Sequence, residues 1–283
     1  MSLINNIQQR FKYANIVEQL IYVNIAVFII AFAVKAFATL MQWDVDPFFD
    51  WFALPAAFEN FFLKPWTIVT YGFLHGGFLH ILFNLIVLFY FGNLFLDFFS
   101  KKDFLIYYFL GIIIGGLVYL VSYNYFPALK HTNAYLVGAS AGIMAIVIGI
   151  ATKIPNYAMH FRFIGAIKLW YIAVAFIVLD LIQMPINTGG HLAHIGGALV
   201  GYLLTAYFSG SKSKSSIVSF FSNIFKKQKP LKTVYKKSKP DMSYKNSDEH
   251  QQKIDKILDK ISKSGYDALT KEEKDFLFSV GKK

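Results

Sequence analysis

The chain has 283 residues, of which 55% are hydrophobic, 18% aromatic and only 16% charged. One soluble core does not bury so much apolar surface, so the composition indicates a membrane protein. The formal net charge is +11, but residues 209–283 carry 18 basic and 9 acidic side chains and so contribute +9 of it, which argues against a nucleic-acid-binding domain. Cysteine is absent, which excludes disulfides, thiolate metal sites and a cysteine nucleophile.

Six apolar segments predict an all-α membrane protein built as a bundle of six transmembrane helices. A polar N-terminal segment, residues 1–15, precedes the bundle and lacks the pattern of a cleaved signal peptide. Lysine and arginine are concentrated in alternate connections, and the positive-inside rule then predicts that both termini are cytoplasmic. The bundle is expected over residues 16–208, with spans at residues 16–40, 78–99, 104–126, 134–152, 166–184 and 190–208.

The connection between the first two spans, residues 41–71, is rich in aromatic residues and interrupted by three prolines. It is too broken to cross a membrane. Aromatic rings favour the membrane interface, so we expect this loop to lie in the outer interface. An ordinary extracellular loop is the alternative.

The basic C-terminal region predicts a separate cytoplasmic module. Residues 209–250 are expected to form an amphipathic helix at 215–227, resting on the inner leaflet, and a flexible linker. Residues 251–283 are expected to form a small helical hairpin, in which Gly265 ends the first helix and Thr270 with Glu273 caps the second. The partner of this tail cannot be inferred from the sequence.

Polar side chains inside apolar spans are costly, and several fall in this chain at one depth. His80 and Asn84 lie four residues apart in the second span and share a helix face. Ser140 lies early in the fourth span, and His191 and His194 lie early in the sixth. In the expected topology these three spans all begin at the outer surface. The coincidence of depth indicates a functional site near that surface.

Ser140 and His194 are the residue types that nucleophilic hydrolysis requires. A serine hydroxyl must transfer its proton to a base, usually histidine, within hydrogen-bond reach. The outer parts of the second, fourth and sixth spans contain no aspartate or glutamate, so a dyad without a third carboxylate is expected. Gly197, Ala198 and Gly201 share a face with His194 and predict the close approach of another helix.

Each of these signals also has a structural interpretation. A G-x-S-x-G string in a membrane helix often serves helix packing, and its two glycines are expected to face away from the serine and give clearance to other neighbours. His75 and His191 fit either a site or a bridge between helices. Asp97 and Asp180 are interpreted as structural.

Three motifs in series resemble the rhomboid family of intramembrane proteases. Together they cover about residues 60–208, and their order along the chain makes them far more specific than any one alone. The matching segments are Pro65-Trp66-Thr67, His75 to Asn84 (HGGFLHILFN), Gly138 to Gly142 (GASAG), and Ala193 to Gly197 (AHIGG) followed by Gly201.

The resemblance implies an intramembrane serine endopeptidase that cleaves transmembrane or membrane-proximal segments of other membrane proteins. Ser140 is then the nucleophile and His194 the general base and acid. The side chains of His80 and Asn84, with the backbone N–H of Ser140, would hold the oxyanion. No cofactor or metal is expected.

The resemblance also implies that substrate enters sideways between the second and fifth spans, where Phe83 and Phe176 would line a gate. Two features depart from the family pattern. Met144 occupies a position where some members carry a tyrosine that packs on the catalytic histidine, and the first loop lacks the common Trp-Arg pair.

Two other classes of protein compete with the protease. A catalytically inactive relative would bind transmembrane clients, although such relatives usually lose the serine or histidine. A channel or transporter would more often show ionisable groups near the midplane or inverted repeats. The expected partners are transmembrane substrates and membrane lipids, and the expected location is a bacterial inner membrane.

Overall fold

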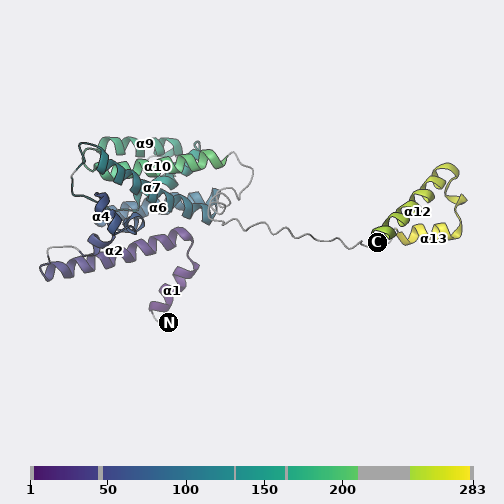
Figure 1. Cartoon of the computed structure of the whole chain (residues 1–283), viewed down its shortest axis with the longest axis horizontal. Helices are drawn as coiled ribbons and strands as arrows, with labels where there is room; N and C mark the ends of the chain where they lie inside the picture. Colours follow the sequence, from purple (N-terminus) through teal and green to yellow (C-terminus); the bar gives the residue numbers. More distant parts are fainter. Residues whose placement is uncertain (1–2, 44–46, 131, 163–164, 210–242, 281–283) are drawn as a thin grey trace. The chain divides into compact units, whose positions relative to one another are not determined.

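The computed structural model describes residues 3–43, 47–130, 132–162, 165–209 and 243–280. The described residues are mostly helical and fall into two compact units, residues 1–226 and 227–283 (Figure 1). The amphipathic helix expected at 215–227 and most of the expected linker lie outside the described residues.

The first unit is a bundle of apolar helices with short elements between them. Among the described residues, three helices are long and apolar enough to cross a membrane, namely α2, α6 and α7, and two shorter ones, α8 and α9, are also apolar. Figure 1 shows α6, α7, α9 and α10 running side by side. The helices of this unit are α1 (Leu3–Tyr13), α2 (Ile16–Leu40), α3 (Pro47–Phe52), α4 (Phe58–Leu63), α5 (Thr67–Thr70), α6 (Phe78–Phe98), α7 (Lys101–Tyr125), α8 (Ser140–Lys153), α9 (Leu169–Gln183) and α10 (Thr188–Ser209).

Capping side chains determine where two of the long helices begin. Asn15 accepts a hydrogen bond from the Glu18 N–H, and the Glu18 carboxylate accepts one from the Asn15 N–H, so α2 begins at Ile16 as expected. Ser100 and Asp103 form the same reciprocal pair. As a result α7 begins at Lys101, before the expected residue 104.

The fourth and fifth expected spans are shorter as helices than the apolar pattern predicted. Residues 135–136 form strand β2 (Tyr135–Leu136), which pairs with β1 (Leu54–Pro55), so α8 begins at Ser140 and not at residue 134. A hairpin of β3 (Ala158–Phe161) and β4 (Gly165–Lys168) precedes α9 and displaces its start from residue 166 to Leu169. In both places backbone pairing between strands ends the helical conformation.

The segment predicted as an interfacial loop, residues 41–71, contains α3, α4, α5 and β1, and the 3-10 helix η1 (Tyr71–Phe73) follows. The Trp51 and Trp66 rings stack with centroids 5.8 Å apart, and the Trp66 indole N–H donates to the Trp51 carbonyl. Tyr71 donates its hydroxyl proton to the Ile112 carbonyl, which ties this segment to α7. The segment is therefore folded against the bundle.

Helix α8 lies at the centre of the first unit. Ten of its 14 residues are buried, and it packs against α6, α7, α9 and α10. Glycines allow the closest of these approaches: a Cβ on Gly197 or Gly201 of α10 would overlap the backbone carbonyls of Ala141 and Ala145 respectively. The expectation that this face of α10 meets another helix at short range is confirmed.

The second unit is a helical hairpin of α12 (Ser243–Ser264), the 3-10 helix η2 (Tyr266–Ala268) and α13 (Lys271–Val280). Gly265, with a φ of 78°, ends the first helix, and Thr270 and Glu273 form the expected capping box. Lys260 of α12 donates to both carboxylate oxygens of Glu273. Because α12 begins at Ser243, the last residues of the predicted linker are helical.

Candidate active site

Ser140 is the first residue of α8, and the residues before it shape its surroundings. Gly138 has a φ of 129°, which favours glycine, and its N–H donates to the Tyr71 carbonyl at 3.0 Å. The N–H groups of the first helical turn have no partner within their own helix. The Ser140 N–H is one of them, so the serine presents a hydroxyl and a backbone donor at the same helix end.

Gly138 does not face away from the serine as the sequence pattern predicted. A Cβ on Gly138 would lie 2.8 Å from His80 Nε2 and 3.4 Å from Ser140 Oγ. The prediction failed because it placed Gly138 inside the helix, whereas α8 begins two residues later. Gly142 does give clearance to another helix, as predicted, since a Cβ added there would lie 2.7 Å from the Tyr108 carbonyl oxygen of α7.

The structure brings Ser140 and His194 together across the contact of α8 with α10. His194 Nε2 lies 2.6 Å from Ser140 Oγ, although 54 residues separate them in the chain. The first turn of α10 is ordered by Asn187, whose Oδ1 accepts from the Gly190 N–H at 3.3 Å and whose carbonyl accepts from the His191 N–H at 3.2 Å. The hydroxyl and imidazole are therefore within direct proton-transfer distance.

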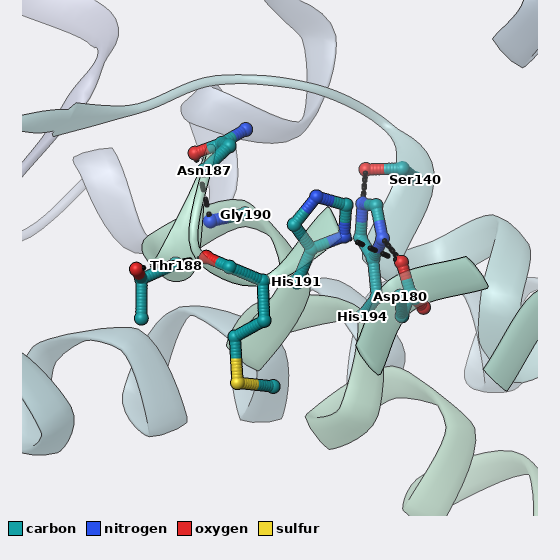
Figure 2. A network of polar contacts seen from close by, with 8 residues as sticks. Ser140, Asp180, Asn187, Thr188, Gly190, His191 and His194 are labelled. Carbon is teal, nitrogen blue, oxygen red and sulfur yellow. Dashed lines mark hydrogen bonds and ion pairs between the residues drawn. The ribbon is translucent and has the colours of Figure 1, made fainter. Parts of the chain in front are cut away.

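A carboxylate also reaches the histidine, contrary to the expectation of a dyad without one. Asp180 Oδ1 lies 2.7 Å from His194 Nδ1 and 2.7 Å from His191 Nδ1. Figure 2 shows Ser140, His194 and Asp180 in sequence, with His191 beside His194. Asp180 lies near the end of α9, in the fifth span, whereas the expectation of a dyad rested on the second, fourth and sixth spans alone. Applying the same depth rule to the outer end of the fifth span would have found it.

His80 approaches the serine from α6. The point occupied by a Cβ on Gly138 is 2.8 Å from His80 Nε2 and 3.4 Å from Ser140 Oγ, so both side chains border the same small space beside Gly138. The Gly76 N–H donates to His80 Nδ1 over a long 3.4 Å. An imidazole that accepts at Nδ1 carries its proton at Nε2, so His80 presents a donor toward the site.

Asn84 is buried one turn further along α6. Its Nδ2 donates one hydrogen bond to the His80 carbonyl at 2.8 Å, and its second N–H is a further donor. The shared face of His80 and Asn84 is thus present in the structure. His75 is also buried near this face, with its ring centroid 5.1 Å from that of His80. Burial, and then the neighbouring His80, lower the pKa of His75 to about 4, so it is uncharged at neutral pH.

Asp180, His191 and His194 are the side chains of this region that could hold a metal ion, since one ligand atom from each lies within 4.8 Å of the others. The Nδ1 atoms of His191 and His194, however, are both at hydrogen-bond distance from Asp180 Oδ1. A metal would have to replace these hydrogen bonds and would use the nitrogen of His194 that faces away from Ser140. The arrangement fits a hydrogen-bonded catalytic histidine more directly.

The expected gate residues differ in their surroundings. Phe83 on α6 is 63% exposed. Phe176 on α9 is partly buried and meets Phe91 edge to face, with centroids 6.3 Å apart. Met144, one of the two departures from the family pattern named above, is buried in α8.

Comparison with known proteins agrees with the motifs. Residues 63–211 match the family described as the rhomboid domain, and the chain belongs to this family. It is also 30% identical over 161 residues to the rhomboid-like protease 3 of Toxoplasma gondii, an alignment that covers 56% of this chain and 56% of that protein. The chain thus spans about half the length of this relative. Residues 244–282 match a second family, whose function is unknown.

Proposed function

We propose that this protein is an intramembrane serine endopeptidase that uses Ser140 as nucleophile and His194 as general base. The observation that carries the proposal is the 2.6 Å contact between Ser140 Oγ and His194 Nε2, made between two apolar helices of a rhomboid-family chain. Serine is a poor nucleophile until a base accepts its proton. The His194 imidazole lies at the right distance to be that base.

The reaction would proceed in two stages. Ser140 Oγ attacks the carbonyl carbon of the scissile bond while its proton passes to His194 Nε2. The tetrahedral intermediate collapses when the imidazolium protonates the leaving amine, and an acyl-enzyme remains. A water molecule then attacks the acyl carbon and gives its proton to His194, and the second collapse returns that proton to Ser140 Oγ as the carboxylic product leaves.

The developing oxyanion needs donors at the helix end where Ser140 lies. The Ser140 N–H is free of intrahelical bonding, His80 presents Nε2–H toward the site, and Asn84 has a second amide proton. These three groups would share the negative charge. All of them lie in the first two turns of α6 or α8, so helical backbone holds them in place.

The proposed topology has six spans, α2, α6, α7, α8, α9 and α10, with both termini in the cytoplasm of a bacterial cell and the tail hairpin on the same side. Transmembrane proteins would be the substrates. Substrate would enter between α6 and α9, past Phe83 and Phe176. The exposed apolar surface of α9 supports this route, because few of its side chains are engaged in packing.

The test is cleavage of a transmembrane reporter by the purified protein in liposomes. We expect cleavage by the wild type, and none by Ser140→Ala or His194→Ala, with the double variant no worse than either single one because the two act as a unit. Fluorophosphonate labelling should modify the wild type and not Ser140→Ala. Substantial cleavage by purified Ser140→Ala would refute the mechanism, and absence of both cleavage and labelling in the wild type would favour an inactive binder of transmembrane clients.

A further inference from the structure

One buried carboxylate serves two histidines at the proposed active site. Asp180 is 6% exposed, and its Oδ1 lies 2.7 Å from the Nδ1 atoms of both His191 and His194 (Figure 2). The rings of the two histidines are nearly perpendicular, at 87°, with centroids 5.4 Å apart. This geometry lets a single oxygen receive two N–H groups from different directions.

The surroundings of Asp180 argue against a role in packing alone. On α9 only Leu169 and Asp180 are buried, while most of the large apolar side chains of this helix are exposed. A carboxylate within an apolar bundle carries a desolvation cost that an apolar residue would avoid. Its position is explained if the charge acts on the histidines that it contacts.

The carboxylate determines which nitrogen of His194 carries the proton. An ionised carboxylate only accepts hydrogen bonds, so the facing Nδ1 must be the donor. The neutral imidazole then has its lone pair at Nε2, the atom 2.6 Å from Ser140 Oγ. This is the tautomer that a general base requires.

We propose that Asp180 is a positioning residue that fixes the tautomer and orientation of His194, and that His191 completes the hydrogen bonding of the shared oxygen. The proposal rests on the proposed protease function and extends it from a dyad to a chain of Ser140, His194 and Asp180. The three residues come from α8, α10 and α9. The catalytic geometry therefore depends on α9 staying against α10, because movement of α9 would withdraw the carboxylate.

The main experiment compares Asp180→Asn with Asp97→Asn, which makes the same substitution on α6. Asparagine keeps the size of the side chain but offers an amide N–H that favours the wrong tautomer. We expect Asp180→Asn to lower kcat by about 10³-fold, with KM changed by less than about threefold, as expected when a histidine loses its orienting carboxylate. Asp97→Asn should match the wild type. Asp180→Glu, which keeps an acceptor, should recover at least about tenfold over Asp180→Asn.

A second readout does not depend on activity. The ¹⁵N chemical shifts of selectively labelled histidine, assigned with a His194→Gln variant, report which ring nitrogen of His194 is protonated. We expect Nδ1–H in the wild type and a shift toward Nε2–H in Asp180→Asn. If the wild type neither cleaves nor labels but shows this switch, the positioning role stands and the protease assignment fails.

Two other results would overturn the positioning role of Asp180 and leave the protease assignment unaffected. Wild-type kinetics in a folded Asp180→Asn would do so, as would a neutral His194 protonated at Nε2 in the wild type. The latter measurement does not use Asp180→Asn, so it decides the question even if that variant does not fold. Equal losses of kcat in Asp180→Asn and Asp97→Asn would also overturn the positioning role, because they would show that removing either carboxylate has the same nonspecific effect.

Discussion

The helix pair α8 and α10 differs from α9 in how it is held in the bundle. Between α8 and α10, glycines bring one helix against the backbone carbonyls of the other, and the Thr205 hydroxyl of α10 donates to the Gly149 carbonyl of α8. Thr205 also forms a hydrogen bond with Tyr107 of α7. Helix α9 has mostly exposed apolar side chains, and a buried aspartate joins it to α10. The proposed nucleophile and base thus lie on a tightly packed pair, whereas the carboxylate lies on a helix with few buried side chains.

The two regions suit two different requirements of an intramembrane hydrolase, precise proton transfer and access for the substrate. Proton transfer needs reacting atoms held within a few tenths of an ångström, and close backbone packing provides that precision. A substrate helix needs lateral access, which a loosely packed helix provides at lower energetic cost. Substitutions in the two regions should therefore have different consequences.

Among substitutions outside the proposed Ser140, His194 and Asp180 chain, the largest effect is expected from Gly197→Val in the tightly packed pair. Even a Cβ at this position overlaps the Ala141 backbone, so α10 must move away from α8 and carry His194 with it. We expect a loss of roughly 3 kcal/mol in unfolding free energy, at the upper end for overpacking, and at least about 10²-fold lower turnover in the folded fraction.

Thermal melting and reporter cleavage in detergent measure the two quantities. Gly77→Val is the matched control, since a Cβ on Gly77 meets no atom within 4 Å and its φ of 179° suits any residue. Its stability should fall by less than about 1 kcal/mol, the range of an N-cap substitution. Equal stability in the two variants would contradict the packing argument.

Asn84→Ala should have the next largest effect, by removing one proposed oxyanion donor from α6. We expect turnover of the reporter to fall by about 10²-fold with little change in melting temperature. Fluorophosphonate labelling of Ser140 should suffer less than it does in His194→Ala. Asn93→Ala on the same helix removes an amide that also bonds the carbonyl four residues earlier, and it should leave turnover unchanged. If a double variant of His80 and Asn84 turned over the reporter at the wild-type rate, neither residue would belong to the proposed oxyanion site.

A smaller effect is expected at α9 from Phe176→Ala. Loss of the edge-to-face contact with Phe91 of α6 loosens α9 on its α6 side and keeps the Asp180 contact with α10, so entry of a transmembrane substrate should become easier. We expect kcat/KM for the reporter to rise about threefold, equivalent to roughly 0.7 kcal/mol and within the range of an aromatic pair, while fluorophosphonate labelling stays constant. Phe37→Ala on α2 removes an exposed ring outside the proposed gate and should change neither kcat/KM nor labelling. A fall in labelling with Phe176→Ala would mean that the ring supports the catalytic geometry.

The smallest effect is expected from removing the tail. Residues 1–226 form a compact unit that contains every proposed catalytic group. A chain ending near Lys227 should cleave the reporter in detergent at a near-normal rate, with the same melting temperature as the full chain. A large loss of either would show that the hairpin stabilises the bundle and is not a separable module.

Local sequence signals predicted much of the helical architecture. Apolar length put the start of α2 at Ile16 and that of α6 at Phe78, both as observed. The starts of α8 and α9 were wrong, because residues 135–136 and 165–168 pair with strands elsewhere in the chain. An apolar residue suits either a helix or a buried strand, so hydropathy alone does not separate them.

The sequence by itself determined that this chain is an apolar helical protein of the rhomboid family and that Ser140 and His194 are its candidate reactive pair, because chain-local patterns and motif spacing carry that information. Only the tertiary structure decided that Asp180 joins them and that Gly138 faces the serine. Which polar side chains meet depends on the rotation and separation of packed helices, and here contacts such as that of Gly197 with the Ala141 backbone set both. Such contacts join residues far apart in the chain. Its depth in the fifth span marks Asp180 as a candidate, but no local pattern records which side chains it meets.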